Sequence, residues 1–165
     1  MSKSLGNFRT VREISEQYDL QVLRFFMLNA HYRSPLNFSA VLMEAAKNAL
    51  ERITDAAANL KDRKAAAQTE TATDAEKELL AQAQEFVKKF EEAMDDDFNT
   101  ADALAAIFEL VKFANTNVSE ASSAEFAGAL LDTIVKLCDV LGLKAVKTEE
   151  ILQMKYLIKQ TFQTT

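Results

Sequence analysis

The most regular apolar pattern in the chain lies in residues 39–64, SAVLMEAAKNALERITDAAANLKDRK. Its apolar side chains recur at steps of four and three, at Leu42, Ala46, Ala49, Ile53, Ala56 and Leu60. This spacing predicts one long amphipathic helix, because residues three and four apart lie on the same helical face. Ser39 is placed to cap its first turn. A seam of this length predicts a helical bundle and requires partner helices elsewhere in the chain.

Later stretches repeat the pattern and supply those partners. The first is a helix from residue 74 to about 94, with an apolar face of Leu79, Ala83, Phe86, Phe90 and Ala93. The second is capped by Asn99 or Thr100, and its apolar face is Ala101, Leu104, Phe108 and Val111. The third begins at Ser122 or Ser123 and ends at Gly142, with an apolar face of Phe126, Leu130, Ile134, Leu137 and Leu141. The last is capped by Thr148 and runs to about Phe162, with an apolar face of Ile151, Met154 and Ile158. We expect the helix at 74–94 to pair with the helix at 39–64.

Two shorter helices precede the bundle. Thr10 and Glu13 have the spacing of a capping box, which predicts a helix from residue 11 to about 18. Asp19 is placed to cap a second helix, from 20 to about 31, whose apolar side chains cover nearly its whole circumference, so we expect burial on most sides. Pro35 interrupts the pattern before the long helix. Residues 65–73 carry no large apolar side chain and predict an exposed, mobile connection.

Seven helices and no strand make an all-α prediction: an up-down helical bundle over residues 39–165, preceded by two short helices within residues 1–38. Only three Gly and one Pro among 165 residues agree with it. The single cysteine, Cys138, excludes an internal disulfide and a cysteine-based metal site within the chain. No charged-then-apolar leader and no run of about 18 apolar residues occurs, so we expect a cytoplasmic protein without a membrane partner.

The distribution of charge points to a polyanion surface in the first part of the chain. The net charge is −6, which argues against a general nucleic-acid binder. Residues 1–66 nevertheless carry a net +3, and residues 67–165 carry −9. The candidate phosphate contacts are therefore Arg9, Arg12, Arg24 and Arg33.

Three other candidates are better explained structurally. His31 has no second histidine for a metal site, so we expect a helix-end residue with local hydrogen bonds. Cys138 follows Leu137 on an apolar helix, which favours a core position over a nucleophile. The acidic residues at 91–92 and 95–97 lack the turn and ligand spacing of a calcium loop, so capping and solvation are the preferred account. No metal site and no complete active site is predicted on this chain.

The first seven residues, MSKSLGN, carry the most specific chemistry. The Lys3 amine, flanked by the hydroxyls of Ser2 and Ser4 and followed by Gly6, suits a loop that contacts phosphate. A disordered tail is the alternative for such a terminus, and it is the state we expect in this chain alone.

These residues resemble a known family. Residues 1–7 resemble the K-M-S-K-S signature loop of class I aminoacyl-tRNA synthetases, beginning after its first lysine. Residues 8–12, 23–26 and 30–39 resemble the cysteinyl-tRNA synthetase family closely. Residues 96–100, with Ala103-Leu104 and Ile107-Phe108, resemble the helical tRNA-binding domain of that family, often called the DALR domain.

The resemblance implies a ligase that activates cysteine with ATP and transfers it to tRNA(Cys). In the family, the lysine matching Lys3 stabilises charge that develops on the departing phosphates, and Ser2 and Ser4 would position the loop. The resemblance also implies that residues 1–38 end the catalytic core, with helices that contact the tRNA stem. Residues 39–165 would form the anticodon-binding type of helical bundle.

The catalytic domain, with its zinc ion, is missing from this sequence, so we expect a fragment that is inactive alone. Two alternatives remain: the helical domain of a related cysteine ligase that uses no tRNA, and a non-catalytic helical interaction module. A truncated boundary would expose apolar surface around Phe8, Leu23 and Phe26, which predicts self-association.

Overall fold

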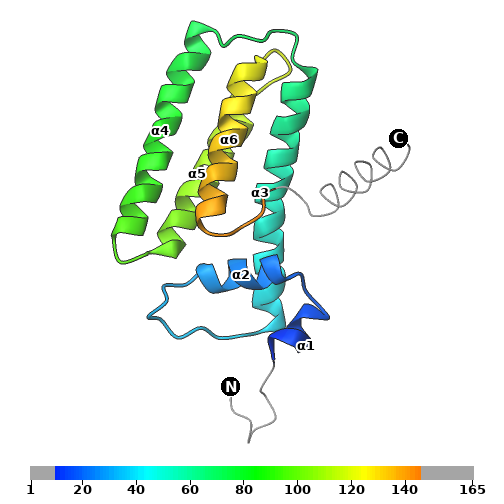
Figure 1. The fold of residues 1–165 in the computed structure, drawn as a ribbon, viewed down its shortest axis with the longest axis vertical. Helices are drawn as coiled ribbons and strands as arrows, with labels where there is room; N and C mark the ends of the chain where they lie inside the picture. Colours follow the sequence, from blue (N-terminus) through cyan, green and yellow to red (C-terminus); the bar gives the residue numbers. More distant parts are fainter. Residues whose placement is uncertain (1–9, 146–165) are drawn as a thin grey trace, which may run out of the picture.

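The computed structural model describes residues 10–145, and all regular structure within that range is helical (Figure 1). The predicted last helix, at residues 148–162, lies outside the described residues. The six helices are α1 (Val11–Ser15), α2 (Leu20–Leu28), α3 (Ala40–Ala66), α4 (Asp74–Asp95), α5 (Thr100–Asn117) and α6 (Ala124–Val140). The all-α prediction is therefore confirmed for the part of the chain that the structure covers.

The helix starts follow from local capping chemistry. Thr10 caps α1 in a capping box with Glu13, Asp19 accepts a hydrogen bond from the Gln21 N–H, and Ser39 accepts one from the Leu42 N–H. Asn99 caps α5 and Ser123 caps α6, which decides between the paired alternatives at each position. α1 and α2 end earlier than predicted, at Ser15 and Leu28.

The four long helices form an up-down bundle, and α2 lies across the lower half of α3 with α1 beside it (Figure 1). α6 packs on α3, and α4 packs on α5 and α6. The expected pairing of α4 with α3 is wrong, because within the described residues these two helices make no contact. The connection at 67–73 instead crosses the end of the bundle (Figure 1).

The prediction that this connection is exposed holds for most of its residues, and Ala72 is the exception. Ala72 is buried, and its N–H donates to the Glu125 carboxylate at 2.7 Å. The Thr69 carbonyl accepts a hydrogen bond from the Ala124 N–H at 2.8 Å. Backbone contacts of this kind are invisible in side-chain periodicity, so the polar composition of 65–73 gave no sign of them.

One carboxylate joins the starts of two helices at this end. The two oxygens of Glu76 accept from the backbone N–H and the hydroxyl of Ser123, each at 2.9 Å, and from the Thr73 N–H at 2.9 Å. Burial raises the pKa of Glu76, but these hydrogen bonds outweigh it and leave the pKa below its ordinary value. Glu76 therefore holds the N-terminus of α4 against that of α6.

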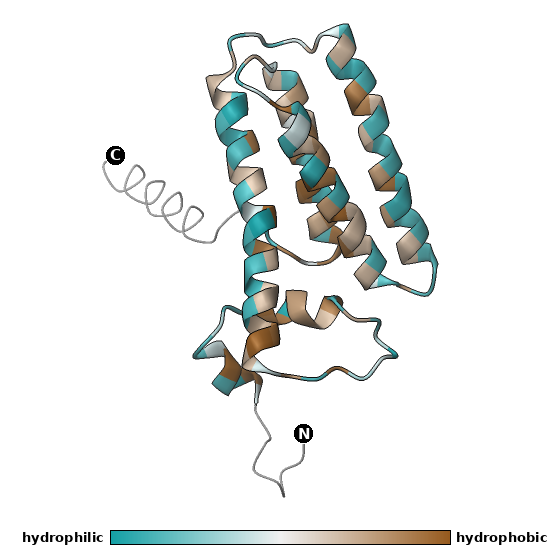
Figure 2. Ribbon diagram, turned by 180° about the vertical axis from the view of Figure 1, so that it is seen from behind, coloured by the Kyte–Doolittle hydropathy of each residue, from teal (hydrophilic) through white to brown (hydrophobic). Residues whose placement is uncertain are grey.

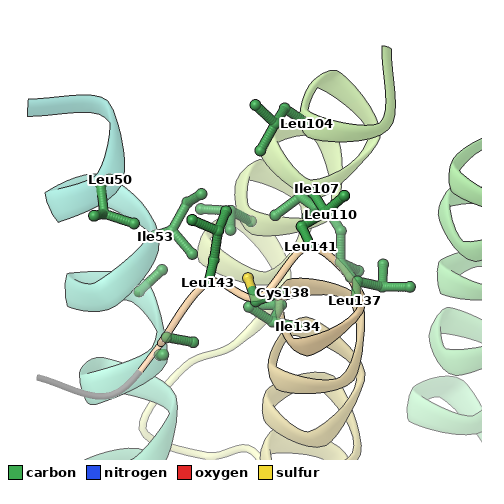
Figure 3. Packing of buried hydrophobic residues seen from close by; sticks show 14 of the residues in the cluster. Leu50, Ile53, Leu104, Ile107, Leu110, Ile134, Leu137, Cys138, Leu141 and Leu143 are labelled. Atoms are coloured by element: carbon green, nitrogen blue, oxygen red, sulfur yellow. The ribbon is translucent and has the colours of Figure 1, made fainter. Parts of the chain in front are cut away.

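The core lies between α3, α5 and α6 and is closed by the turn after α6 (Figure 3). Side chains from these four segments converge there, namely Leu50, Ile53, Leu104, Ile107, Leu110, Ile134, Leu137, Cys138, Leu141 and Leu143 (Figure 3). Hydrophilic residues cover the outward faces of the bundle helices (Figure 2). The seam of α3 runs through Met43, Ala46, Leu50, Ile53, Ala57 and Leu60. The predicted start of this seam is wrong, since Leu42 is 45% exposed.

The prediction that α2 is buried on most sides is also wrong in part. Phe25 and Phe26 are buried, whereas Leu20 and Met27 are more than half exposed. Phe26 and the partly buried Leu23 pack in the core, so the exposed apolar surface at this end belongs instead to neighbours such as Val11, Leu20 and Met27. Phe8 lies outside the described residues.

Candidate nucleic-acid interface

The residues predicted to contact ATP cannot be placed. Lys3, Ser2 and Ser4, together with Arg9, precede the first described residue, so their roles stay predictions. The described chain begins at Thr10, whose N–H donates to the Glu13 carboxylate at 2.7 Å. The Glu13 N–H donates to the Thr10 hydroxyl at 3.2 Å. This reciprocal pair fixes the first turn of α1 directly after the predicted loop.

Arg12 and Arg24 lie at the α1–α2 end of the molecule, and both are exposed. Arg24 extends over the turn that follows α6, because a Cβ atom on Gly142 would lie 2.9 Å from its guanidinium carbon. Gly142 has φ +67, a left-handed backbone that also favours glycine. The Lys144 N–H donates to the Gln21 side chain at 2.8 Å. The contact of Arg24 with Gly142 and the hydrogen bond between Gln21 and Lys144 hold α2 against the turn that follows α6.

Arg33 follows α2 and is engaged within the protein. Its Nη2 lies 3.1 Å from Oδ2 of Asp97, and its Nε donates to the Tyr32 hydroxyl at 3.0 Å. That hydroxyl donates to Oδ1 of Asp97 at 2.8 Å. The hydrogen bond to Asp97 raises the pKa of Tyr32 above its ordinary value. Arg33 is thus less available to phosphate than the sequence suggested.

The predicted basic residues share one end of the molecule without forming one cluster. Arg12 precedes α2, Arg24 lies on it facing the end of α6, and Arg33 follows it (Figure 1). A polyanion at this end would meet separate positive charges.

Negatively charged side chains line an open groove between α4 and α5, which has a volume of about 580 Å³. Four carboxylates line it, at Glu92, Asp96, Asp102 and Glu109, and the Lys89 amine pairs with Glu109. Clustered carboxylates repel phosphate, so this face disfavours a nucleic acid. Within the described residues, the α4–α5 face is therefore the less favourable of the two for a polyanion.

His31 and Cys138 have the structural roles that were expected. The Arg33 N–H donates to Nδ1 of His31 at 3.2 Å, and the histidine ring stacks on Tyr32 with centroids 4.8 Å apart. Cys138 is buried in the core, and burial raises the pKa of its thiol to about 12. The described residues contain no group of three potential ligands for a metal ion. Among them, no helix is long and apolar enough to cross a membrane.

The acidic run at 95–97 was only partly understood from the sequence. Asp96 follows the last residue of α4 and donates its backbone N–H to the Glu92 carbonyl, whereas α5 is capped by Asn99, which lies outside the acidic run. The expected capping role in this turn therefore belongs to Asn99 and not to the acidic side chains. The role of Asp97 was missed. Its partners, Tyr32 and Arg33, lie 65 and 64 residues away in the chain, so no local pattern could have indicated the contact.

Two protein families match separate parts of the chain. The catalytic domain of class I (C) tRNA synthetases matches residues 1–48, and the DALR domain matches residues 89–146. The first range contains α1, α2 and the start of α3. The second begins in α4 and ends after α6.

Similar curated proteins are cysteine–tRNA ligases. The ligase of Lachnospira eligens is 57% identical over 152 residues, which are 92% of this chain and 32% of the relative. The ligases of Lachnoclostridium phytofermentans and Clostridioides difficile are 51% and 47% identical, each over 92% of this chain and 33% of the relative. The chain thus spans about a third of the length of the curated relatives it matches.

A solved structure supports the fold. The LeuRS–tRNA–LeuAMS ternary complex of Agrobacterium radiobacter K84 contains a chain that matches 86% of this protein with a TM-score of 0.66. The match covers 21% of that chain. At 22% sequence identity, it bears on the architecture alone.

Proposed function

Because the chain is homologous to cysteinyl-tRNA synthetases over the end of the class I catalytic domain and the DALR domain, we propose that it forms the tRNA-binding part of a cysteine–tRNA ligase. The whole ligase would activate cysteine with ATP, releasing pyrophosphate, and then transfer the cysteinyl group to tRNA(Cys). The observation that carries the proposal is 57% identity to such a ligase across 92% of this chain.

In this proposal residues 1–9 supply the second half of the ATP-contacting signature loop. Lys3 stabilises the negative charge that develops as pyrophosphate leaves, and the hydroxyls of Ser2 and Ser4 hold the loop in place. Position 9 then begins the tRNA surface, which continues through Arg12 and Arg24 at the α1–α2 end. Arg33 contributes less, because Asp97 already neutralises it.

The acidic groove between α4 and α5 supports this orientation. Its four carboxylates would repel the tRNA backbone, whereas the α1–α2 end carries exposed arginines. The bundle would therefore brace tRNA through contacts to its phosphates next to the catalytic core. No step of the reaction is assigned to the α4–α5 face.

We further propose that this chain alone does not activate cysteine, and that the whole ligase works in the cytoplasm. A zinc ion would belong to the part of the ligase that lies outside the matched third. The three relatives are all named as tRNA ligases, which favours this function over a cysteine ligase that uses no tRNA or a helical interaction module.

The proposal is tested with a joined ligase, defined as the Lachnospira eligens enzyme with its matched segment replaced by this chain. Lys3→Ala in the joined ligase should lower cysteine-dependent ATP–pyrophosphate exchange far more than it weakens tRNA binding, measured by filter retention. Equal losses in both would remove the role assigned to Lys3. Measurable ATP–pyrophosphate exchange by the isolated 165-residue chain would refute the proposal that it does not activate cysteine alone.

A further inference from the structure

Three side chains close a ring between two distant parts of the chain, and we call them the clasp: Tyr32, Arg33 and Asp97. The Tyr32 hydroxyl donates to Asp97 at 2.8 Å, and Arg33 donates to Tyr32 at 3.0 Å and to Asp97 at 3.3 Å. The Arg33 guanidinium also lies over the Tyr32 ring, 5.3 Å from its centroid. Each member of the clasp therefore contacts both of the others.

Asp97 lies in a turn whose backbone is left-handed at two successive residues. Asp97 and Phe98 have φ values of +55 and +54, a left-handed conformation that costs roughly 1 kcal/mol or more per non-glycine residue. Aspartate tolerates this conformation, whereas it is unusual for a bulky residue such as Phe98. The Asn99 N–H donates to the Ala93 carbonyl at 3.0 Å, which holds the turn in place.

A hydrogen bond between α5 and the end of α2 joins the same two parts of the chain. The Thr100 hydroxyl, in the first turn of α5, donates to the Leu28 carbonyl at 2.7 Å. Leu28 ends α2, and the segment from 29 to 39 that follows has no regular secondary structure. The start of this segment is therefore held by its contacts with the turn between α4 and α5, while Phe38 near its end packs on Phe26.

The clasp joins the two regions that match different domain families. Tyr32 and Arg33 lie in the range that matches the catalytic domain, residues 1–48. Asp97 lies in the range that matches the DALR domain, residues 89–146. A contact between these ranges fixes how the end of one region sits on the other.

We propose that Asp97 is a positioning residue that holds the segment after α2 against the α4–α5 turn and thereby sets the angle between the catalytic and tRNA-binding parts of the ligase. This inference rests on the proposed function. A tRNA bound across both parts reaches the catalytic centre only at one relative orientation, and small misplacements lower transfer rates strongly. Cysteine activation takes place within the catalytic part and does not depend on that angle.

The first test measures hydrogen exchange in the whole 165-residue chain. Asp97→Asn retains the tolerance for a left-handed backbone but removes the charge that pairs with Arg33. We expect amide exchange in residues 30–38 to accelerate about fivefold, as for loss of an exposed charge pair. Asp96→Asn, one residue earlier, makes the same charge change outside the clasp and should leave those amides unchanged. Equal exchange in the two variants would refute the clasp.

The second test separates positioning from folding in the joined ligase. With Asp97→Asn, kcat/KM for tRNA(Cys) should fall about tenfold while ATP–pyrophosphate exchange stays within about twofold. Equal losses in both reactions, or no loss in either, would refute the positioning role. A joined ligase with native Asp97 that fails to charge tRNA would instead refute the proposed function.

Discussion

Replacing Glu76 with glutamine should destabilise the protein by an amount that depends on pH. The carboxylate accepts four hydrogen bonds, two from Thr73 and two from Ser123. The Ser123 N–H and hydroxyl donate to different oxygens of Glu76, and glutamine would offer only one acceptor oxygen, so one donor of Ser123, which is only 1% exposed, would lose its partner. A buried donor left unpaired costs about 1–3 kcal/mol, and we expect a loss of about 2 kcal/mol at pH 7.

The pH dependence follows from the lowered pKa of Glu76. A carboxylate whose pKa is lower in the folded state contributes stability above its unfolded pKa, and this contribution is lost as the pH falls through the folded value. The difference in the free energy of unfolding between wild type and Glu76→Gln should therefore reach its maximum at pH 7. It should narrow progressively below the ordinary glutamate pKa of 4.5.

Urea unfolding followed by circular dichroism measures this difference, and thermal unfolding should show a decrease in Tm of about 4–8 °C at pH 7. Glu78→Gln is the matched control, because it makes the same change on an exposed position of α4. The control should stay within about 0.5 kcal/mol of wild type. The reasoning fails if Glu76→Gln costs no more than the control, or if its cost grows as the pH falls.

Three further substitutions or measurements test the fold. Gly142→Ala should cost about 1–2 kcal/mol in urea unfolding, because φ is +67 and the new Cβ would meet Arg24; a neutral result would contradict the described turn. Leu50→Ala, at a buried position, should lower the free energy of unfolding by about 2–4 kcal/mol, whereas Leu42→Ala should lower it by under about 1 kcal/mol. The reverse order would support the apolar face that was predicted from the sequence, which includes Leu42 and not Leu50. Cys138, with a thiol pKa of about 12, should react with iodoacetamide at pH 8 only after unfolding; rapid labelling of the folded protein would show an exposed thiolate.

Local chemistry made the helix starts predictable. Thr10, Asp19, Ser39 and Ser123 cap helices as their sequence positions indicated, and Gly142 adopts the left-handed backbone expected after a helix. Each of these features depends on residues within four positions. A single sequence contains all the information that such a contact requires.

Partner choice was not predictable in the same way. Periodicity identifies the apolar face of α4 but not the helix that covers it, so pairing with α3 was expected where the structure has α5 and α6. The clasp and the contacts of the crossing connection join residues dozens of positions apart. The core position of Cys138 was predicted correctly from the apolar face of its own helix, whereas for His31 only the local hydrogen bond was expected and its position 3.9 Å from Asp97 was not.

The central claim is that this chain serves as the tRNA-binding part of a cysteine–tRNA ligase. The most direct measurement is cysteinylation of tRNA(Cys) by the joined ligase, compared with the intact Lachnospira eligens enzyme under the same conditions. We expect charging within about tenfold of the intact enzyme, together with normal ATP–pyrophosphate exchange. Normal exchange without any charging would contradict it, because cysteine would be activated while this chain failed to present the tRNA.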